Sequence, residues 1–148
     1  MGSFHFIVFF IFLFLVLKAQ ISLVSIHPKI EEFVDYCNKL LGNLVFIVEG
    51  KRDTKVLRLL GLNGQIVEKG GLSIYELVDK ISLTETIVIL TDFDLEGKKL
   101  RKQIRNEIQH RKGHGRIDSH ARQLLFRFCR SVRVSEIEDL KQFIPLTQ

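Results

Sequence analysis

Two short, entirely apolar runs, each followed by acidic residues, constrain the fold of this chain most strongly. Leu44–Val48 reads LVFIV, and Thr86–Leu90 reads TIVIL. An apolar run without polar alternation is typical of a strand that is buried on both faces, and such strands occur in parallel sheets covered by helices on both sides. The sequence therefore predicts an α/β fold with a mostly parallel sheet and helices on both faces.

The rest of the body alternates between segments of helical spacing and short turns. Ser73 and Glu76 form a capping box at the start of one predicted helix. The other predicted helices span Pro28–Leu41, Asp53–Leu60, Leu95–Gln109, Ser119–Cys129 and Ile137–Phe143. The remaining predicted elements are strands at Gln65–Val67 and Val132–Val134 and a loop at His110–Arg116. This alternation indicates a single domain over residues 27–148.

Residues 1–26 form a separate apolar segment. Within it, Phe4–Leu17 reads FHFIVFFIFLFLVL and has no charged residue before Lys18. A spanning helix needs about 20 apolar residues, so this run is short for one. Three interpretations stay open: a misassigned start codon, a membrane anchor, and a secretory signal peptide that lacks a basic leading region. For an anchor, the cations that follow the run would keep the body in the cytoplasm.

Positive charge is concentrated in one part of the chain. The protein has 22 Lys and Arg residues against 17 Asp and Glu residues, a net charge of +5. Between Leu95 and Arg133, twelve basic residues face three acidic ones, so the remainder is net acidic. Such clustering predicts a polyanionic partner, because cations that bind a phosphate backbone release its counterions. The alternative is a solvated basic helix face. With only two cysteines, a disulfide scaffold and a four-cysteine zinc site are excluded.

Acidic residues follow both apolar runs at the point where each predicted strand ends. Glu49 follows the first strand, and Asp92 and Asp94 follow the second. The carboxyl ends of parallel strands meet at one edge of a sheet, where ligands of such sheets bind. Crowded carboxylates oppose one another's ionisation, and Mg²⁺ relieves that repulsion. We therefore predict a site for one or two Mg²⁺ ions at Glu49, Asp92 and Asp94.

These motifs, in this order, resemble the Toprim domain. That family has Glu-Gly after its first strand and Asp-x-Asp after a later strand, with a glycine three residues beyond. Here the corresponding text is VEGKRDT and ILTDFDLEGKKLRKQI. Topoisomerases, bacterial primases, recombination mediators and overcoming-lysogenization-type nucleases share the domain. The local text looks most like the maturase nuclease of 5S ribosomal RNA and like small stand-alone archaeal Toprim proteins. The resemblance covers about Leu44–Leu140 and implies a Rossmann-like sheet.

The resemblance also implies roles for individual residues. Glu49 would be a general acid/base or a carboxylate coupled to the metal, and Asp92 and Asp94 would hold Mg²⁺. Lys51 and Arg52 would contact phosphate, whereas we expect Asp53 to be only a helix N-cap. A phosphate backbone bound at the acidic residues would then continue along the basic helix that starts at Leu95. The cations of that helix are Lys98, Lys99, Arg101, Lys102 and Arg105.

Two functions are compatible with these motifs. The first is a Mg²⁺-dependent nuclease that cleaves phosphodiester bonds in RNA or DNA, with RNA favoured by the maturase resemblance. The second is a Toprim module that binds or assembles nucleic acid without catalysis. The length leaves no room for the extra domains of a topoisomerase or a primase. Because the maturase has sequence beyond its Toprim part, we also expect a partner protein that supplies specificity.

Overall fold

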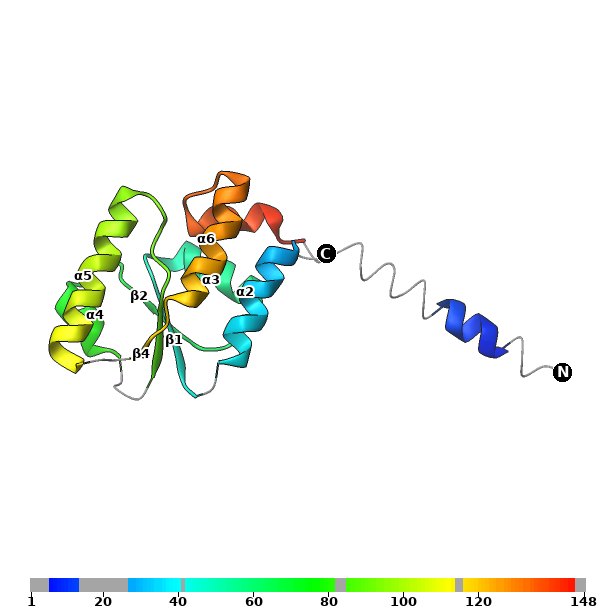
Figure 1. Ribbon diagram of the computed structural model, residues 1–148, viewed down its shortest axis with the longest axis horizontal. Coiled ribbons are helices and arrows are strands. Elements are labelled where there is room, and N and C mark those ends of the chain that lie inside the picture. The colour runs from blue at the N-terminus through cyan, green and yellow to red at the C-terminus, as the bar shows by residue number, and fades with distance from the viewer. Residues whose placement is uncertain (1–5, 14–26, 41, 82–84, 114–115, 146–148) are drawn as a thin grey trace.

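The computed structural model describes residues 6–13, 27–40, 42–81, 85–113 and 116–145 (Figure 1). In this part of the chain a parallel sheet has the strand order β2-β1-β3-β4. The strands are β1 (Leu44–Val48), β2 (Gln65–Glu68), β3 (Thr86–Ile89) and β4 (Arg116–Ile117). The predicted α/β fold is confirmed, and both strands that were predicted from apolar runs form the centre of the sheet.

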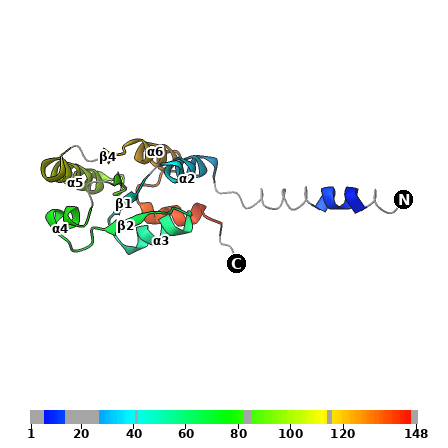
Figure 2. The same cartoon turned by 90° about the horizontal axis from the view of Figure 1, so that it is seen from below.

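Helices cover both faces of this sheet (Figures 1 and 2). On one face lie α2 (Pro28–Lys39), α3 (Lys51–Leu59), α6 (His120–Val132) and the 3₁₀ helix η1 (Ile137–Phe143). On the other face lie α4 (Ile74–Asp79) and α5 (Leu95–Lys112). Each crossover between parallel strands therefore places a helix on the sheet, as parallel connections require.

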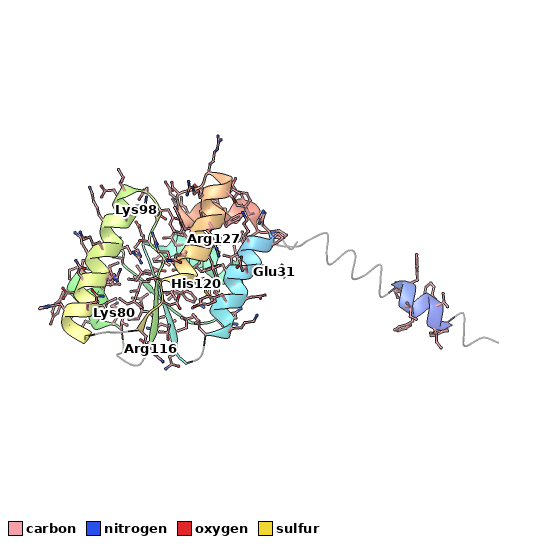
Figure 3. All side chains as sticks on the ribbon, in the orientation of Figure 1. Glu31, Lys80, Lys98, Arg116, His120 and Arg127 are labelled. Atoms are coloured by element: carbon pink, nitrogen blue, oxygen red, sulfur yellow. The ribbon has the colours of Figure 1, made fainter. Side chains whose placement is uncertain are left out.

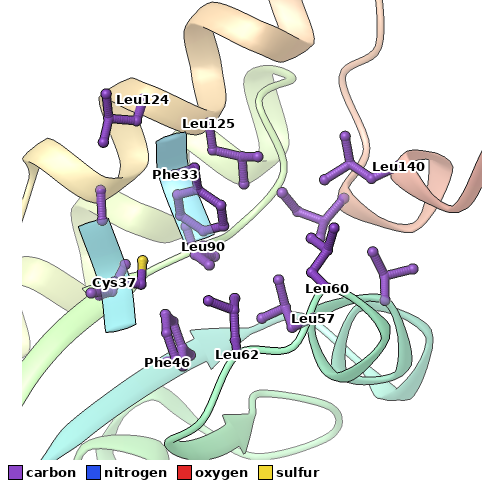
Figure 4. Packing of buried hydrophobic residues seen from close by; sticks show 14 of the residues in the cluster. Phe33, Cys37, Phe46, Leu57, Leu60, Leu62, Leu90, Leu124, Leu125 and Leu140 are labelled. Atoms are coloured by element: carbon purple, nitrogen blue, oxygen red, sulfur yellow. The ribbon is translucent and has the colours of Figure 1, made fainter. Parts of the chain in front are cut away.

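Strand β1 is buried along its whole length because it supplies side chains to both layers. Phe46 and Val48 pack with the helices of the larger core (Figure 4), which includes Phe33 and Leu125. Val45 and Ile47 point to the opposite face and pack with α4 and α5. Successive residues of a strand face opposite sides of a sheet, so burial on both sides requires an uninterrupted apolar run.

Two parts of the predicted secondary structure are wrong. Val132–Val134 is not a strand, because α6 continues to Val132 and Arg133 ends it in the left-handed conformation, with φ of 58°. The edge strand beside β3 is instead β4, which begins at the last residue of the predicted loop His110–Arg116, while α5 extends through the first part of that loop to Lys112. Its two residues pair with Thr86 and Ile87 of β3. A strand of two residues has no measurable periodicity, so only tertiary pairing identifies it.

Helix α3 begins at Lys51, two residues earlier than predicted. Gly50 is its N-cap, and the Asp53 carboxylate accepts a hydrogen bond from the Gly50 N–H at 3.0 Å. Asp53 therefore lies in the first turn and satisfies a free backbone donor from there, so its predicted position as the N-cap is wrong.

Residues 6–13 form a short helix whose side chains are all exposed, from 69% for Phe6 to 43% for Leu13. No helix among the described residues is long and apolar enough to cross a membrane. The rest of the predicted apolar segment, residues 1–5 and 14–26, lies outside the described residues. The interpretations of residues 1–26 therefore stay predictions.

Candidate functional site

The carboxyl ends of β1 and β3 bring Glu49 and Asp92 into contact. Glu49 follows β1 directly, and Asp92 follows β3 after Leu90 and Thr91. The Glu49 Oε1 atom accepts a hydrogen bond from the Asp92 N–H at 2.9 Å. Two acids that are 43 residues apart in the chain therefore meet at one edge of the sheet.

The Asp92 carboxylate lies in an environment that disfavours its charge. Its side chain is half-buried, and burial is the main reason that its pKa rises to about 7. Glu49, Asp53 and Asp94 raise this pKa further by repulsion, while a hydrogen bond from the Ile137 N–H to Oδ1 opposes the shift. A cation at this position would relieve both the repulsion and the loss of solvation.

Asp94 caps the helix that starts beside this carboxylate. Its Oδ1 accepts a hydrogen bond from the Gly97 N–H at 2.7 Å. Thr91 Oγ1 donates to the Gly97 carbonyl at 2.7 Å, so the turn after β3 is bound to the first turn of α5. The fold thus uses Asp94 as a helix cap and also places its charge near Asp92.

Two further acids extend the site beyond the predicted ones. The pKa of Asp53 is raised by burial, with contributions from Glu49 and Glu138. Glu138 lies in η1 and forms a 3.3 Å ion pair with Arg52, one of the predicted phosphate contacts. The sequence signal for this extension is the acidic run at residues 136–139, which stands out directly after the basic region.

Whether this edge can hold a Mg²⁺ ion depends on which carboxylate oxygens are free. Among the described residues, no hydrogen bond engages Oε2 of Glu49 or Oδ2 of Asp92, so each carboxylate has an oxygen free to act as a ligand. Mg²⁺ keeps several waters and commonly takes only one or two carboxylates, so this pair fits the ion. In the described part of the chain, three acidic ligand atoms lie within 4.8 Å of one another at Glu136, Glu138 and Asp139, not at the predicted triad.

The predicted phosphate contacts surround this edge on α3 and α5. Lys51 is exposed at the start of α3, and Lys98 is exposed near the start of α5 (Figure 3). Lys99 forms a 3.5 Å ion pair with Glu96, and it lines, together with Glu49, a cavity of about 550 Å³. Further along α5, Arg101 is half-buried, and Lys102 and Arg105 are exposed. The cations therefore lead away from the acidic edge along one helix.

Arg122, which is not among the predicted site residues, supports the turn that holds Asp92. Its side chain is buried and donates to the carbonyls of Ile89 at 3.2 Å, Thr91 at 2.5 Å and Asp92 at 3.0 Å. Burial, with repulsion from Arg101, lowers the pKa of Arg122 to about 10. On a basic amphipathic helix such an arginine looks like a surface cation, so the sequence had no signal for its role.

The fold and the site together define a parallel α/β protein with an acidic centre at the carboxyl edge of its sheet and cations on the helix that follows. The chain belongs to the UPF0292 family. It is 34% identical over 114 residues to the UPF0292 protein of Pyrococcus furiosus, covering 77% of this chain and 82% of that protein. It is 32% identical over 115 residues to the UPF0292 protein of Thermococcus onnurineus, with the same two coverages.

A third relative is the UPF0292 protein of Methanocaldococcus jannaschii, 32% identical over 100 residues that cover 66% of this chain and 76% of that protein. Among solved structures, a putative protein from Aquifex aeolicus matches with a TM-score of 0.57 and 20% identity, covering 78% of this chain and 97% of that one. This likeness shows a shared fold. No protein-family model matches the chain.

Proposed function

We propose that this protein is a magnesium-dependent nuclease with a Toprim domain, cleaving phosphodiester bonds in RNA or DNA. The observation that supports the proposal best is the contact between Glu49 and Asp92 at the carboxyl edge of the sheet. A divalent cation at this edge would offset both the desolvation of the Asp92 carboxylate and its repulsion by neighbouring acids. The order of the acidic motifs, which resembles the Toprim pattern, supports the same function.

Each group would have a separate task. Glu49 and Asp92 would hold Mg²⁺, and Asp94, whose Oδ1 caps α5, would add its negative charge beside them or a ligand to a second ion. Bound Mg²⁺ would polarise the phosphodiester and orient the attacking oxygen. Lys51, Lys98 and Lys99, which are exposed beside the acids, would neutralise the substrate phosphates. Glu49 would also act as a general acid/base, with its orientation set by the hydrogen bond from the Asp92 N–H.

RNA is the favoured substrate because the motifs resemble the maturase nuclease. Lys102 and Arg105 continue the basic surface of α5 and would follow the phosphate backbone away from the cut. A partner protein would supply specificity. The cytoplasm is the proposed location of the body, and the two buried free cysteines, Cys37 and Cys129, suit such a reducing compartment.

The test compares cleavage of total cellular RNA and DNA by the full chain in Mg²⁺ and in EDTA. Glu49→Gln, Asp92→Asn and Asp94→Asn each keep the oxygen that accepts the observed hydrogen bond, so they remove charge without removing a structural contact. The matched control is Asp79→Asn, at the end of α4, where the charge pairs with Arg111.

We expect Mg²⁺-dependent cleavage by the native chain and by Asp79→Asn, and a loss of about 100-fold or more in Glu49→Gln and Asp92→Asn. Absence of cleavage, together with salt-sensitive nucleic-acid binding that survives all three amide substitutions, would instead establish the non-catalytic binding module.

A further inference from the structure

A second cavity, of about 270 Å³, lies between α5 and α6 behind the turn that holds Asp92. Lys98 and Arg101 of α5, Arg122 and Phe126 of α6, and Phe93 of the turn line it. Its volume is just below the usual range for small-molecule sites, about 300–1,000 Å³, so it has room for no more than one small ligand unit. The Asp92 backbone is a shared boundary, because Arg122 donates to the Asp92 carbonyl from the side of this cavity.

The cavity has positive charge without a carboxylate partner. In the described part of the chain, no ion pair engages Lys98, Arg101 or Arg122. The Arg122 guanidinium donates to backbone carbonyls. Arg101 donates to Ser119 Oγ at 3.4 Å, and its buried Nε atom has no hydrogen-bond partner. Desolvation and neighbouring cations lower the pKa of both arginines. An anion in the cavity would accept a hydrogen bond from the Arg101 guanidinium and offset the repulsion between the neighbouring cations.

An aromatic surface lies beside these cations. The rings of Phe93 and Phe126 are 5.2 Å apart between centroids, and Phe126 is 37% exposed. Phe128, two residues further along α6, is fully buried, so the exposure of Phe126 is not shared by its neighbour. An exposed ring beside unpaired cations offers a planar surface for a base next to a site for its phosphate.

We infer that the cavity between α5 and α6 binds one nucleotide unit, with the phosphate held by Lys98 and Arg101 and the base packed on Phe126. Such a base must be unpaired, so the ligand class is a free nucleotide or an unpaired nucleotide of a strand. The inference rests on the proposed function in one respect only: it gives the nuclease a preference for unpaired nucleotides near the cut. Binding itself needs no metal.

The test therefore measures binding by the full chain in EDTA, by calorimetry or fluorescence. The probes are adenosine 5′-monophosphate, adenosine, a short single-stranded oligoribonucleotide and its blunt duplex. Phe126→Leu keeps an apolar side chain but removes the aromatic face, and Lys98→Gln removes an exposed charge. Arg130→Gln, an exposed residue of α6 that does not line the cavity, is the control of equal charge change.

We expect the monophosphate and the single strand to bind, and Phe126→Leu to weaken both by about fivefold or more. Lys98→Gln should weaken binding of the monophosphate and leave binding of adenosine unchanged. Arg130→Gln should change the affinity for neither probe. If the monophosphate and the single strand bind with different affinities, the tighter one shows whether the cavity prefers a free nucleotide or an unpaired nucleotide of a strand. Unfolding midpoints of all variants show whether each is folded.

The inference is overturned if the monophosphate does not bind, if Phe126→Leu and Lys98→Gln bind as the native chain does, or if Arg130→Gln weakens binding equally. Failure of the proposed function looks different. Absent cleavage with Phe126-dependent binding would reject the nuclease and keep the nucleotide site. Mg²⁺-dependent cleavage by the native chain, with no binding of the monophosphate in EDTA, would keep the nuclease and reject the nucleotide site.

Discussion

Gly97 packs so closely against the backbone of Asp92 that a Cβ atom at position 97 would overlap the Asp92 carbonyl group. The contact joins the first turn of α5 to the turn that follows β3. Since the obstructing atoms are backbone rather than a flexible side chain, either the helix or the turn must move to admit a larger residue. Glycine at this position is therefore a condition for the geometry of Asp92.

Gly97→Ala should destabilise the protein by about 1–3 kcal/mol, the usual cost of forcing an extra carbon into a packed site. Urea unfolding measures the effect. Gly71→Ala is the control, because a Cβ atom at position 71 meets nothing within 4 Å and should change the free energy of unfolding by less than about 0.5 kcal/mol. Equal midpoints for the two variants would contradict the close packing at Asp92.

Asp92 should make the metal-free protein less stable as the pH rises. Its pKa is raised from 3.8 to about 7, mainly by burial, so the folded state holds a proton that the unfolded state has released in this interval. The contribution of Asp92 to the free energy of unfolding is therefore fully present below its pKa in the unfolded chain. It is lost as the pH rises through about 7, its pKa in the folded protein.

Asp92→Asn stays neutral and keeps an acceptor for the Ile137 N–H. In EDTA, its melting temperature should exceed that of the native chain near about pH 8, and the difference should shrink toward about pH 5. Asp79→Asn, whose charge lies at an exposed ion pair, should show no such trend. A difference that stays constant across the pH range would refute the assigned cause.

Arg122→Leu should destabilise the fold by about 2 kcal/mol or more, because the carbonyls of Ile89, Thr91 and Asp92 lose their donor in a buried place. Arg122→Lys should recover only part of this loss, since one ammonium group cannot reproduce the fork of a guanidinium. Arg130→Leu, on an exposed part of the same helix, should stay within about 0.5 kcal/mol in urea unfolding.

A chain that starts at His27 should keep the unfolding midpoint of the full chain. The side chains of residues 6–13 are all exposed, and the two cores consist of residues from Ile30 onward. His27 must remain, because its ring packs on Phe128 with 4.8 Å between the ring centroids. Its Nδ1 also accepts a hydrogen bond from the Lys29 N–H at the start of α2. A clear drop in midpoint would show that the apolar segment contributes to the body's stability.

The sequence by itself determined the central sheet and the edge at which the acids meet. Leu44–Val48 had to be buried on both faces because it has no polar alternation, and parallel strands place their carboxyl ends together. Glu49 and Asp92 could therefore be placed near each other without coordinates. The capping box at Ser73 and Glu76 was equally readable, because its hydrogen bonds are local.

Tertiary structure alone decided the remaining features. Phe126 and Phe128 look alike in sequence, and only packing exposes one and buries the other. Arg122 resembles its basic neighbours in the sequence, and only the fold brings it to the carbonyl of Ile89 in β3 and to those of Thr91 and Asp92 in the following turn. Strand β4 exists only through its pairing with β3. The raised pKa of Asp92 likewise depends on burial and on repulsion by Glu49 and Asp53, which lie about 40 residues earlier in the chain. Each of these depends on contacts between distant residues, and local sequence patterns do not encode the distances that make them.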